Sequence, residues 1–452
     1  MPLDYAHPTG ATIHLAVIKH PATDPAHRIG TVFFNPGGPG ASGVTYLKQA
    51  YPTEPDAPSD FGPSLRADYD MVSFDPRGVG HSAPVHCLSA AQLDQFTALN
   101  PNPTTPADIN ATVAADKAFV AACQARSGAL LPYLGTLNAA RDMDVLRAAL
   151  GDQKLNYLGF SYGTYLGAIY TELFGDRVGR MVLDGPLPPD LTSEQLDLQQ
   201  ARGFQTELNR FVADCVHQPD CPLGTDPAVA PKMLAAFLTY TGSHPLATGT
   251  PRALNGALAQ TGLVSAMYDS PTSWPKLRRA LSSALAGDGH RLLALADDYN
   301  ERHHNGHYSN SDEANIAINC VDHPSPVHST ADVLAKLPAY EQASPLIGAG
   351  DDWSELPCAF WPAQAQTQPH PVHYAGQPPI LVVGNTGDPA TPYPGAQDMA
   401  RQLGSAVLLT YNGDGHTAYG RDITCINNAV DTYLTKGTPP PPHTICPPSP
   451  GS

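Results

Sequence analysis

The sequence predicts an α/β fold, a mostly parallel β-sheet with helices on both faces. Two observations predict it. Six short apolar runs read as buried strands, and the first five end at a polar or glycine-rich turn, as parallel strands do; they are residues 31–34, 71–74, 157–159, 181–183, 380–383 and 407–411. Between the fourth and fifth runs, amphipathic helical stretches replace the strand pattern. We therefore expect one sheet with a helical insertion between two of its strands.

A helix is expected directly before the third strand. In residues 138–150, Asn138 is a suitable N-cap, and Met143, Leu146 and Leu150 lie along one helical face. An apolar stripe of this kind packs a helix onto a sheet.

The insertion divides the chain into three parts. We expect the first part of the core in residues 1–185, a helical cap in residues 186–375 and the rest of the core in residues 376–452. The chain is longer than the roughly 250–300 residues at which one hydrophobic core stops growing. Helical patterns in the insertion are residues 196–216, 231–240 and 274–286. Helices inserted between two strands are the layout of a cap over an active site.

Charge and hydropathy exclude several classes of partner. The 452 residues carry a formal net charge of −17, which argues against nucleic acid and against an anionic membrane surface. No apolar stretch approaches the roughly 20 residues that span a bilayer. The first residues, Met1 to Tyr5, lack the charged-then-apolar pattern of a signal peptide, so any such segment lies outside this numbering.

Eight cysteines suggest disulfides and an exported, extracellular protein. None stands in a C-x-x-C spacing, so zinc and redox motifs are not indicated. The alternative is a cytosolic enzyme with buried free thiols. Eight cysteines allow 105 pairings, and our working pairing joins sequence neighbours: Cys87 with Cys123, Cys215 with Cys221, Cys320 with Cys358, and Cys425 with Cys446.

The most informative motif is the G-x-S-x-G sequence of residues 159–163, which lies between a strand pattern and a helical pattern. This is the nucleophile elbow in its required strand–turn–helix setting. The turn is so tight that Gly159 and Gly163 have no room for a Cβ. It raises Ser161 at the carboxyl edge of the sheet, with the Tyr162 N–H beneath a developing oxyanion. A chance match is common in glycine-rich chains, so the motif needs partners.

Two partners follow in the chain order Ser, Asp, His. Asp388 lies in the loop after the strand at 380–383, where the orienting acid belongs. His416 follows the last strand in a glycine-containing loop, and would act as general base and acid for Ser161. Asp414 is the competing acid, but it sits two residues from the histidine and after the wrong strand.

A glycine-rich loop after the first strand completes the machinery. Residues 35–40 offer a backbone N–H, most simply that of Gly38, to complement Tyr162 in an oxyanion hole. A phosphate cradle is the alternative, but the G-K-[ST] ending of a P-loop is missing. Asp75 and Arg77 follow the second strand, and we interpret them as structural braces of the loops around the nucleophile.

Taken together, the motifs resemble a known family of α/β-hydrolase exopeptidases: the prolyl aminopeptidases and, more closely, the secreted bacterial tripeptidyl aminopeptidases. The resemblance covers essentially the whole chain and rests on N-P-G-G-P-G at 35–40, D-P-R-G-V-G-H-S at 75–82, G-F-S-Y-G at 159–163, G-D-P-A-T-P at 387–392 and G-D-G-H at 413–416. Residues 2–5, 317–322 and 358–362 look like the tripeptidyl branch. Pro36 stands where prolyl aminopeptidases have a histidine, which also favours that branch.

The resemblance implies a serine exopeptidase that releases short peptides from free N-termini through an acyl-enzyme on Ser161. It also implies a disulfide between Cys320 and Cys358. No metal or other cofactor is expected; the cluster of His303, His304 and His307 is interrupted by Asn305-Gly306. The sequence does not determine the oligomeric state, and a monomer is our expectation. The alternatives are an esterase, amidase or thioesterase with the same triad, and a binding module without activity.

Substrate reading is expected from the cap, because an exopeptidase must pair the substrate ammonium with carboxylates. Asp322 is the first candidate, followed by Glu313 and Asp312, with Asn319 in the same segment. Asp322 could equally cap a helix. Trp361 could line an apolar subsite or be a buried residue of the cap.

Overall fold

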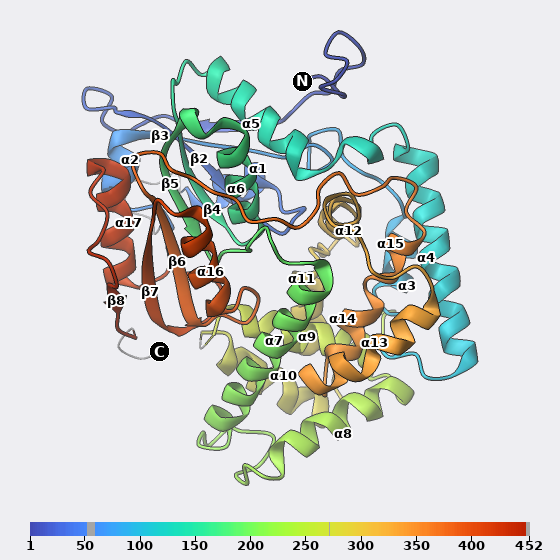
Figure 1. Ribbon diagram of the computed structural model, residues 1–452. Coiled ribbons are helices and arrows are strands. Elements are labelled where there is room, and N and C mark those ends of the chain that lie inside the picture. The colour runs from blue at the N-terminus through green and yellow to red at the C-terminus, as the bar shows by residue number, and fades with distance from the viewer. Residues whose placement is uncertain (52–58, 271, 449–452) are drawn as a thin grey trace.

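The computed structural model describes residues 1–51, 59–270 and 272–448. Within these residues eight strands form one sheet in the order β1-β3-β2-β4-β5-β6-β7-β8 (Figure 1). Every neighbouring pair is parallel except β1 with β3. The strands are β1 (Val17–His20), β2 (Gly30–Asn35), β3 (Tyr69–Phe74), β4 (Leu155–Phe160), β5 (Val178–Asp184), β6 (Ile380–Gly387), β7 (Ala406–Asp414) and β8 (Ile445–Cys446).

All six predicted strands are present, and each is longer than predicted. Two edge strands, β1 and β8, were not predicted. β1 alternates between exposed and half-buried residues, and β8 has only two residues, so neither carries a buried apolar run. Such short or half-exposed segments are typical of sheet edges.

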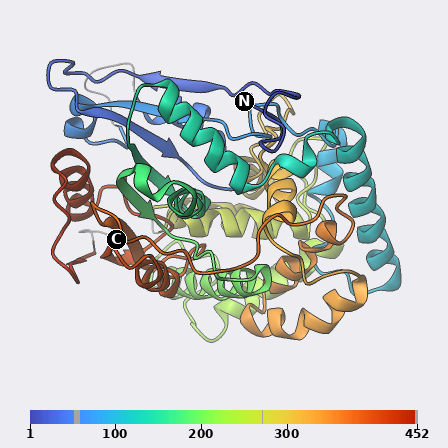
Figure 2. The ribbon, with the colours of Figure 1, turned by 45° about the horizontal axis from the view of Figure 1, so that its top comes forward.

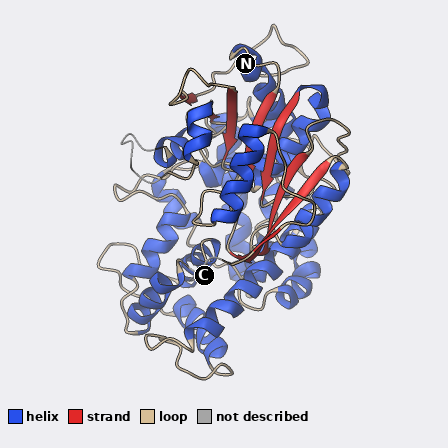
Figure 3. Cartoon of the chain, turned by 90° about the vertical axis from the view of Figure 1, so that its left-hand side faces the viewer, coloured by secondary structure: helices blue, strands red, loops and turns tan. Residues whose placement is uncertain are grey.

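Helices cover both faces of the sheet, as predicted. One face packs against α5 (Thr136–Ala149), α6 (Tyr162–Phe174) and α16 (Tyr393–Leu403). The other packs against α1 (Gly43–Ala50), α2 (Pro63–Asp68) and α17 (Thr424–Lys436). Figure 3 shows the strands between these layers. The inner strands are rich in apolar residues because both of their faces are buried.

Between β5 and β6 the elements of the described residues are all helices, and they form most of the lower half of Figure 1. The predicted stretches 196–216, 231–240 and 274–286 correspond to three of them. The helices are α7 (Ser193–Cys215), α8 (Ala230–Ser243), α9 (Gly256–Tyr268), α10 (Trp274–Leu285), α11 (His290–Tyr299), α12 (Ser311–Asp322), α13 (Thr330–Ala343), α14 (Gly348–Trp353) and α15 (Leu356–Ala359).

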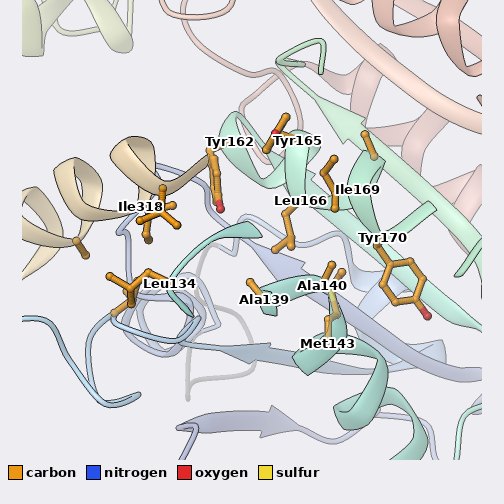
Figure 4. Packing of buried hydrophobic residues seen from close by; sticks show 14 of the residues in the cluster. Leu134, Ala139, Ala140, Met143, Tyr162, Tyr165, Leu166, Ile169, Tyr170 and Ile318 are labelled. Atoms are coloured by element: carbon orange, nitrogen blue, oxygen red, sulfur yellow. The ribbon is translucent and has the colours of Figure 1, made fainter. Parts of the chain in front are cut away.

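These helices do not share one core. Helices α7 to α11 enclose an apolar cluster of their own. Helix α12, in contrast, buries Ala314, Ala317 and Ile318 in the cluster that covers the sheet. Figure 4 shows Ile318 close to Leu134 and Tyr162, next to the packed side chains of α5 and α6. Helix α12 therefore belongs by its packing to the core, although it lies inside the predicted cap segment.

A second excursion leaves the sheet after β3. It contains α3 (Ala90–Phe96) and α4 (Pro106–Ser127), and it is followed by the short 3₁₀ helix η1 (Leu131–Tyr133); a second one, η2 (Gly175–Arg177), precedes β5. Ile109 and Val113 of α4 pack against buried residues of α13 to α15. Figure 2 shows α4 alongside the cap helices. Part of the predicted core segment 1–185 thus packs with the cap.

The helix predicted at 138–150 exists as α5, but its predicted N-cap is wrong. The N-cap is Gly135, which has no side chain and so cannot cap the helix with a side-chain acceptor. The first turn is capped instead from another element: Asp322 Oδ1 accepts the Thr136 N–H at 2.6 Å. Asn138 lies inside the helix, where its amide donates to the carbonyl of Tyr133 at 3.2 Å.

All four disulfides of the working pairing are present: Cys87–Cys123, Cys215–Cys221, Cys320–Cys358 and Cys425–Cys446. They tie α4 to the loop after β3, the end of α7 to the next turn, α12 to α15, and α17 to β8. Across the described residues, no helix has both the length and the apolar character needed to cross a membrane.

Asp75 and Arg77 are structural, as interpreted. Asp75 accepts hydrogen bonds from Ser42 Oγ at 2.7 Å and the Val44 N–H at 3.0 Å, which fixes the start of α1 after the glycine-rich loop. Arg77 is fully buried and forms a bidentate ion pair with Asp142 on α5, with both N–O distances 2.7 Å. Arg77 therefore braces α5 and not the nucleophile turn itself.

Candidate active site

Ser161 lies in a strained turn between β4 and α6. Its backbone has φ 54° and ψ −125°, a conformation that residues with a side chain rarely adopt. Its N–H donates to the carbonyl of Asp184 at the end of β5, at 2.9 Å, which holds the turn against the neighbouring strand. This is the geometry expected of a nucleophile elbow.

The glycines that flank the serine are required by packing. A Cβ on Gly159 would lie 2.5 Å from the carbonyl oxygen of Gly163. A Cβ on Gly163 would lie 2.8 Å from the backbone oxygen of Asn35 at the end of β2. Both distances are far below van der Waals contact, so the turn excludes any side chain at either position, as predicted.

The structure brings the predicted acid and base into contact. His416 Nδ1 lies 2.9 Å from Asp388 Oδ1 and 3.1 Å from Oδ2. Asp388 is buried, and it also accepts the N–H groups of Ala390 and Thr391, at 3.0 and 2.8 Å. A carboxylate held this firmly can accept a proton carried on Nδ1, and in the neutral imidazole Nε2 is then the nitrogen able to accept a proton.

The competing acid points elsewhere. Asp414 forms an ion pair with Arg210 of α7. The partner of His416 Nδ1 is Asp388.

Asp184 supports the histidine loop from below. Its buried carboxylate accepts the N–H of Ala418 at 3.0 Å and of Tyr419 at 2.8 Å. Burial raises the pKa of Asp184 to about 6, and the two N–H groups act in the opposite direction. No motif in the sequence marks Asp184, because only the fold brings the end of β5 next to the histidine loop.

The glycine-rich loop lies against the elbow. Gly37 and Gly38 have φ of 94° and 106°, and the Gly37 N–H donates to Asn35 Oδ1 at 3.0 Å. A Cβ on Gly37 would lie 2.5 Å from the carbonyl of Phe160. Because α6 begins at Tyr162, the N–H groups of its first turn have no partner within the helix. Gly38 and Tyr162 both border the cavity described next.

A cavity of about 530 Å³ lies between the edge of the sheet and the helices α7, α12 and α15. Ser161 and His416 both line it, so the nucleophile and the base candidates face one space. A volume of this size accommodates a small ligand or a short peptide segment.

The predicted substrate residues do not all face the cavity. Asn319 lines the cavity, and its amide donates to Asn315 Oδ1 at 3.1 Å. Glu313 is turned inward and accepts the N–H groups of Cys87 and Leu88, at 2.9 and 2.6 Å. Glu313 is therefore outside the cavity wall and is left out of the proposed site.

Asp322 and Trp361 are also outside the cavity wall. Asp322 caps α5, accepting both the N–H and the hydroxyl of Thr136, and burial raises its pKa to about 7. Trp361 packs in the cluster that covers the sheet. The helix-cap alternative for Asp322 and the buried-residue alternative for Trp361 describe the structure.

Helical periodicity explains which residues of α12 face the cavity. The lining positions recur every three or four residues, as on one helix face; they are Ser311, Asp312, Asn315, Ile316, Asn319 and, just after the helix, His323. Glu313 and Asp322 lie on the two flanks of this face, where backbone N–H groups of Leu88 and Thr136 bind them. Of the candidates named from the sequence, Asp312 and Asn319 line the cavity. Helical spacing alone does not exclude Asp322, because it lies seven residues after Asn315 and therefore on nearly the same side of the helix.

Several lining residues were not predicted. Asp197 of α7 and Glu355, just before α15, border the cavity, as do Glu301 and the aromatic side chains of Tyr268 and Tyr299. Among the lining residues that the structure describes, four are carboxylates and none is lysine or arginine. No sequence pattern connects these residues, because they come from separate helices of the cap.

Comparisons with known proteins agree with this geometry. A family model described as "TAP-like protein" matches residues 344–446. The serine protease Hip1 of Mycobacterium tuberculosis is 39% identical over 99% of this chain and 86% of its own length. Carboxylesterase B of the same organism is 40% identical over 99% of this chain and 85% of its own length. The tripeptidyl aminopeptidase of Streptomyces coelicolor is 35% identical over 97% and 80%.

Proposed function

Because the chain belongs to the family of tripeptidyl aminopeptidase-like α/β-hydrolases, we propose that it is a serine exopeptidase that releases short peptides from free N-termini. The family membership rests on relatives that match almost the whole chain. The assignment of the substrate rests on the charge of the cavity wall.

The proposed mechanism uses Ser161, His416 and Asp388. Ser161 Oγ attacks the peptide carbonyl while His416 Nε2 takes its proton, and the N–H groups of Tyr162 and Gly38 stabilise the oxyanion. The C–N bond then breaks as His416 returns the proton to the leaving amine, which leaves an ester on Ser161. Water activated by His416 hydrolyses that ester, releases the peptide acid and regenerates the serine.

One observation carries the substrate assignment: the cavity wall has four carboxylates and, among its described residues, no lysine or arginine. Asp197 Oδ2 is buried without a hydrogen-bond partner. Burial and the neighbouring Glu355 carboxylate raise the pKa of Asp197. The carboxyl groups of Asp197 and Glu355 interact with each other, and such a pair gains free energy when a cation approaches. The ammonium group of a free N-terminus is such a cation, so we assign it to Asp197 and Glu355.

The esterase alternative is supported by the carboxylesterase B relative, which would use the same catalytic residues. An ester with an uncharged acyl group, however, gains nothing from four carboxylates and would have to desolvate them. The charge of the wall therefore favours the aminopeptidase.

The test compares p-nitroanilides of tripeptides and of single amino acids, each with a free and an acetylated N-terminus. We expect acetylation to lower kcat/KM by at least about 30-fold, the usual cost of removing one member of a buried charge pair. Ser161→Ala is the blank. The better of the two lengths identifies the size of the released product. Equal rates with and without the acetyl group would instead support the esterase.

The anchor itself is tested by Asp197→Asn. We expect KM for the free-amine substrate to rise about 10-fold or more, with little change for the acetylated one. Asp298→Asn, an exposed residue outside the catalytic cavity, is the matched control and should leave both unchanged. An equal loss on both substrates in Asp197→Asn would show that Asp197 does not read the amine.

We also propose that the enzyme is secreted and acts as a monomer. The four disulfides support export, because such bonds persist in oxidising compartments. Light scattering on the purified chain tests the monomer, and fractionation of the producing cells tests secretion.

A further inference from the structure

The loop that carries His416 is held by two different bodies of the molecule. Of the five backbone N–H groups from Gly415 to Tyr419, four donate to core residues at the carboxyl ends of β5 and β6, namely Asp184, Gly387 and Asp388. The exception is the N–H of His416 itself. It donates to the carbonyl of Tyr268, the last residue of the cap helix α9, at 2.8 Å.

The side chain of Tyr268 contacts the same histidine. The two rings meet edge to face, with centroids 5.5 Å apart and planes at 81°. Tyr268 is held in turn by the ring of Phe204 on α7, at 5.2 Å between centroids, and by the hydroxyl of Tyr299, at 3.4 Å. Its position is therefore set by the cap and not by the core.

Two arginines hold the loop around His416. Before the histidine, Asp414 pairs with Arg210 of α7. After it, the Arg421 guanidinium donates to the loop carbonyls of Asp414 and Thr417, at 3.1 and 3.2 Å. The same guanidinium donates to the cap carbonyl of Ser270 at 2.8 Å.

We propose that Tyr268 is a positioning residue for His416, and that the cap sets the alignment of the general base as well as covering the cavity. The carbonyl of Tyr268 fixes the backbone of His416, and its ring limits rotation of the imidazole. Helix α7 also carries Asp197, which we propose binds the substrate ammonium. The same helix holds the histidine loop through Arg210. A correctly bound peptide would thereby stabilise the base in its working position.

This inference rests on His416 being the base of the proposed function, so the test uses a substrate that needs only the triad. We would measure kcat and KM for p-nitrophenyl acetate and for the best peptide anilide, together with the rate of phosphonylation by a fluorophosphonate. Ser161→Ala must abolish all three. If it does not, the proposed function fails independently of Tyr268. If the wild-type enzyme hydrolyses only the ester, the exopeptidase assignment fails. The role of Tyr268 can then still be tested with the ester.

Tyr268→Leu removes the ring and keeps the carbonyl. We expect kcat to fall by about 10-fold to 100-fold on both substrates, with a similar loss of phosphonylation rate, because small displacements of a catalytic group cost factors of this size. Tyr268→Phe, which keeps the ring, should recover most of that loss. Tyr240→Leu is the matched control: Tyr240 is an exposed cap tyrosine stacked on His244, with centroids 4.6 Å apart.

Asp414→Asn provides a second variant that leaves the apolar cap intact, and it should lower kcat on both substrates in the same way, by about threefold or more. A change confined to KM of the peptide would overturn the proposal, since Tyr268 would then only form part of the substrate wall. Wild-type kcat in both Tyr268→Leu and Asp414→Asn would overturn it as well. If Tyr268→Leu does not fold, the result of Asp414→Asn decides.

Discussion

At the scale of single residues, the site depends on positions where the backbone leaves no space. Ser161 occupies a positive φ, and the glycines two residues before and after it would place a Cβ within 2.5–2.8 Å of backbone oxygens. The elbow is therefore a packing requirement as much as a chemical one. For this reason the motif was readable from the sequence.

Gly159→Ala is expected to destabilise the chain by about 3 kcal/mol or more and to abolish hydrolysis, because the new Cβ forces the turn apart. Urea unfolding and ester hydrolysis measure the two effects. Gly242→Ala is the control: its Cβ would meet nothing within 4 Å in the helix α8, so a neutral or slightly stabilising effect is expected. Full activity in Gly159→Ala would contradict the packing argument.

At the scale of elements, α12 connects the two halves of the molecule. One side of this helix lines the cavity and the other packs on the sheet, while its last residue, Asp322, caps α5. Asp322 and Glu313 were predicted to bind substrate because of their charge, but both accept backbone N–H groups instead. Charge alone does not say whether a carboxylate meets a ligand or a backbone N–H.

Asp322→Ala removes the cap of α5 and leaves the buried Thr136 N–H without its acceptor, while the Thr136 hydroxyl keeps only its contact with the Tyr162 hydroxyl. We expect a loss of about 2–4 kcal/mol in the free energy of unfolding. Asp322→Asn should lose less, since its amide oxygen still accepts the N–H of Thr136. Denaturant unfolding monitored by fluorescence measures both. If KM for the peptide rises in the folded Asp322→Asn variant with stability unchanged, the residue acts on substrate after all.

At the scale of the whole molecule, many acids are buried in a chain of net charge −17. Burial alone raises the pKa of Asp116 on α4 to about 7, and burial with neighbouring acids does the same for Asp312 and Asp352. A carboxyl with a raised pKa in the folded state binds a proton that the unfolded chain has already lost near pH 4. The stability that these protonated carboxyl groups contribute is therefore fully present below about pH 4 and is lost as the pH rises through about 7.

Asp116→Asn tests this pH dependence. The amide cannot ionise. The free energy of unfolding of the variant, taken relative to that of the unmodified chain, should therefore be about 1–3 kcal/mol higher at pH 8 than at pH 5. Thermal unfolding across this pH range measures the difference. Asp298→Asn, which changes an exposed acid, should show no such pH-dependent gain. The same gain in both variants would attribute the effect to net charge and not to burial.

The sequence by itself determined six strands of the sheet, the elbow, and the order of Ser161, Asp388 and His416 along the chain. These features depend on local patterns: buried strands are rich in apolar residues, and tight turns need glycine. Only the tertiary structure decided that Asp322 caps α5, that α4 packs with the cap, and that Asp197 and Tyr268 face the catalytic cavity. Each of those depends on contacts between segments far apart in the chain, and the face that a side chain presents to a distant segment is set by packing of the whole.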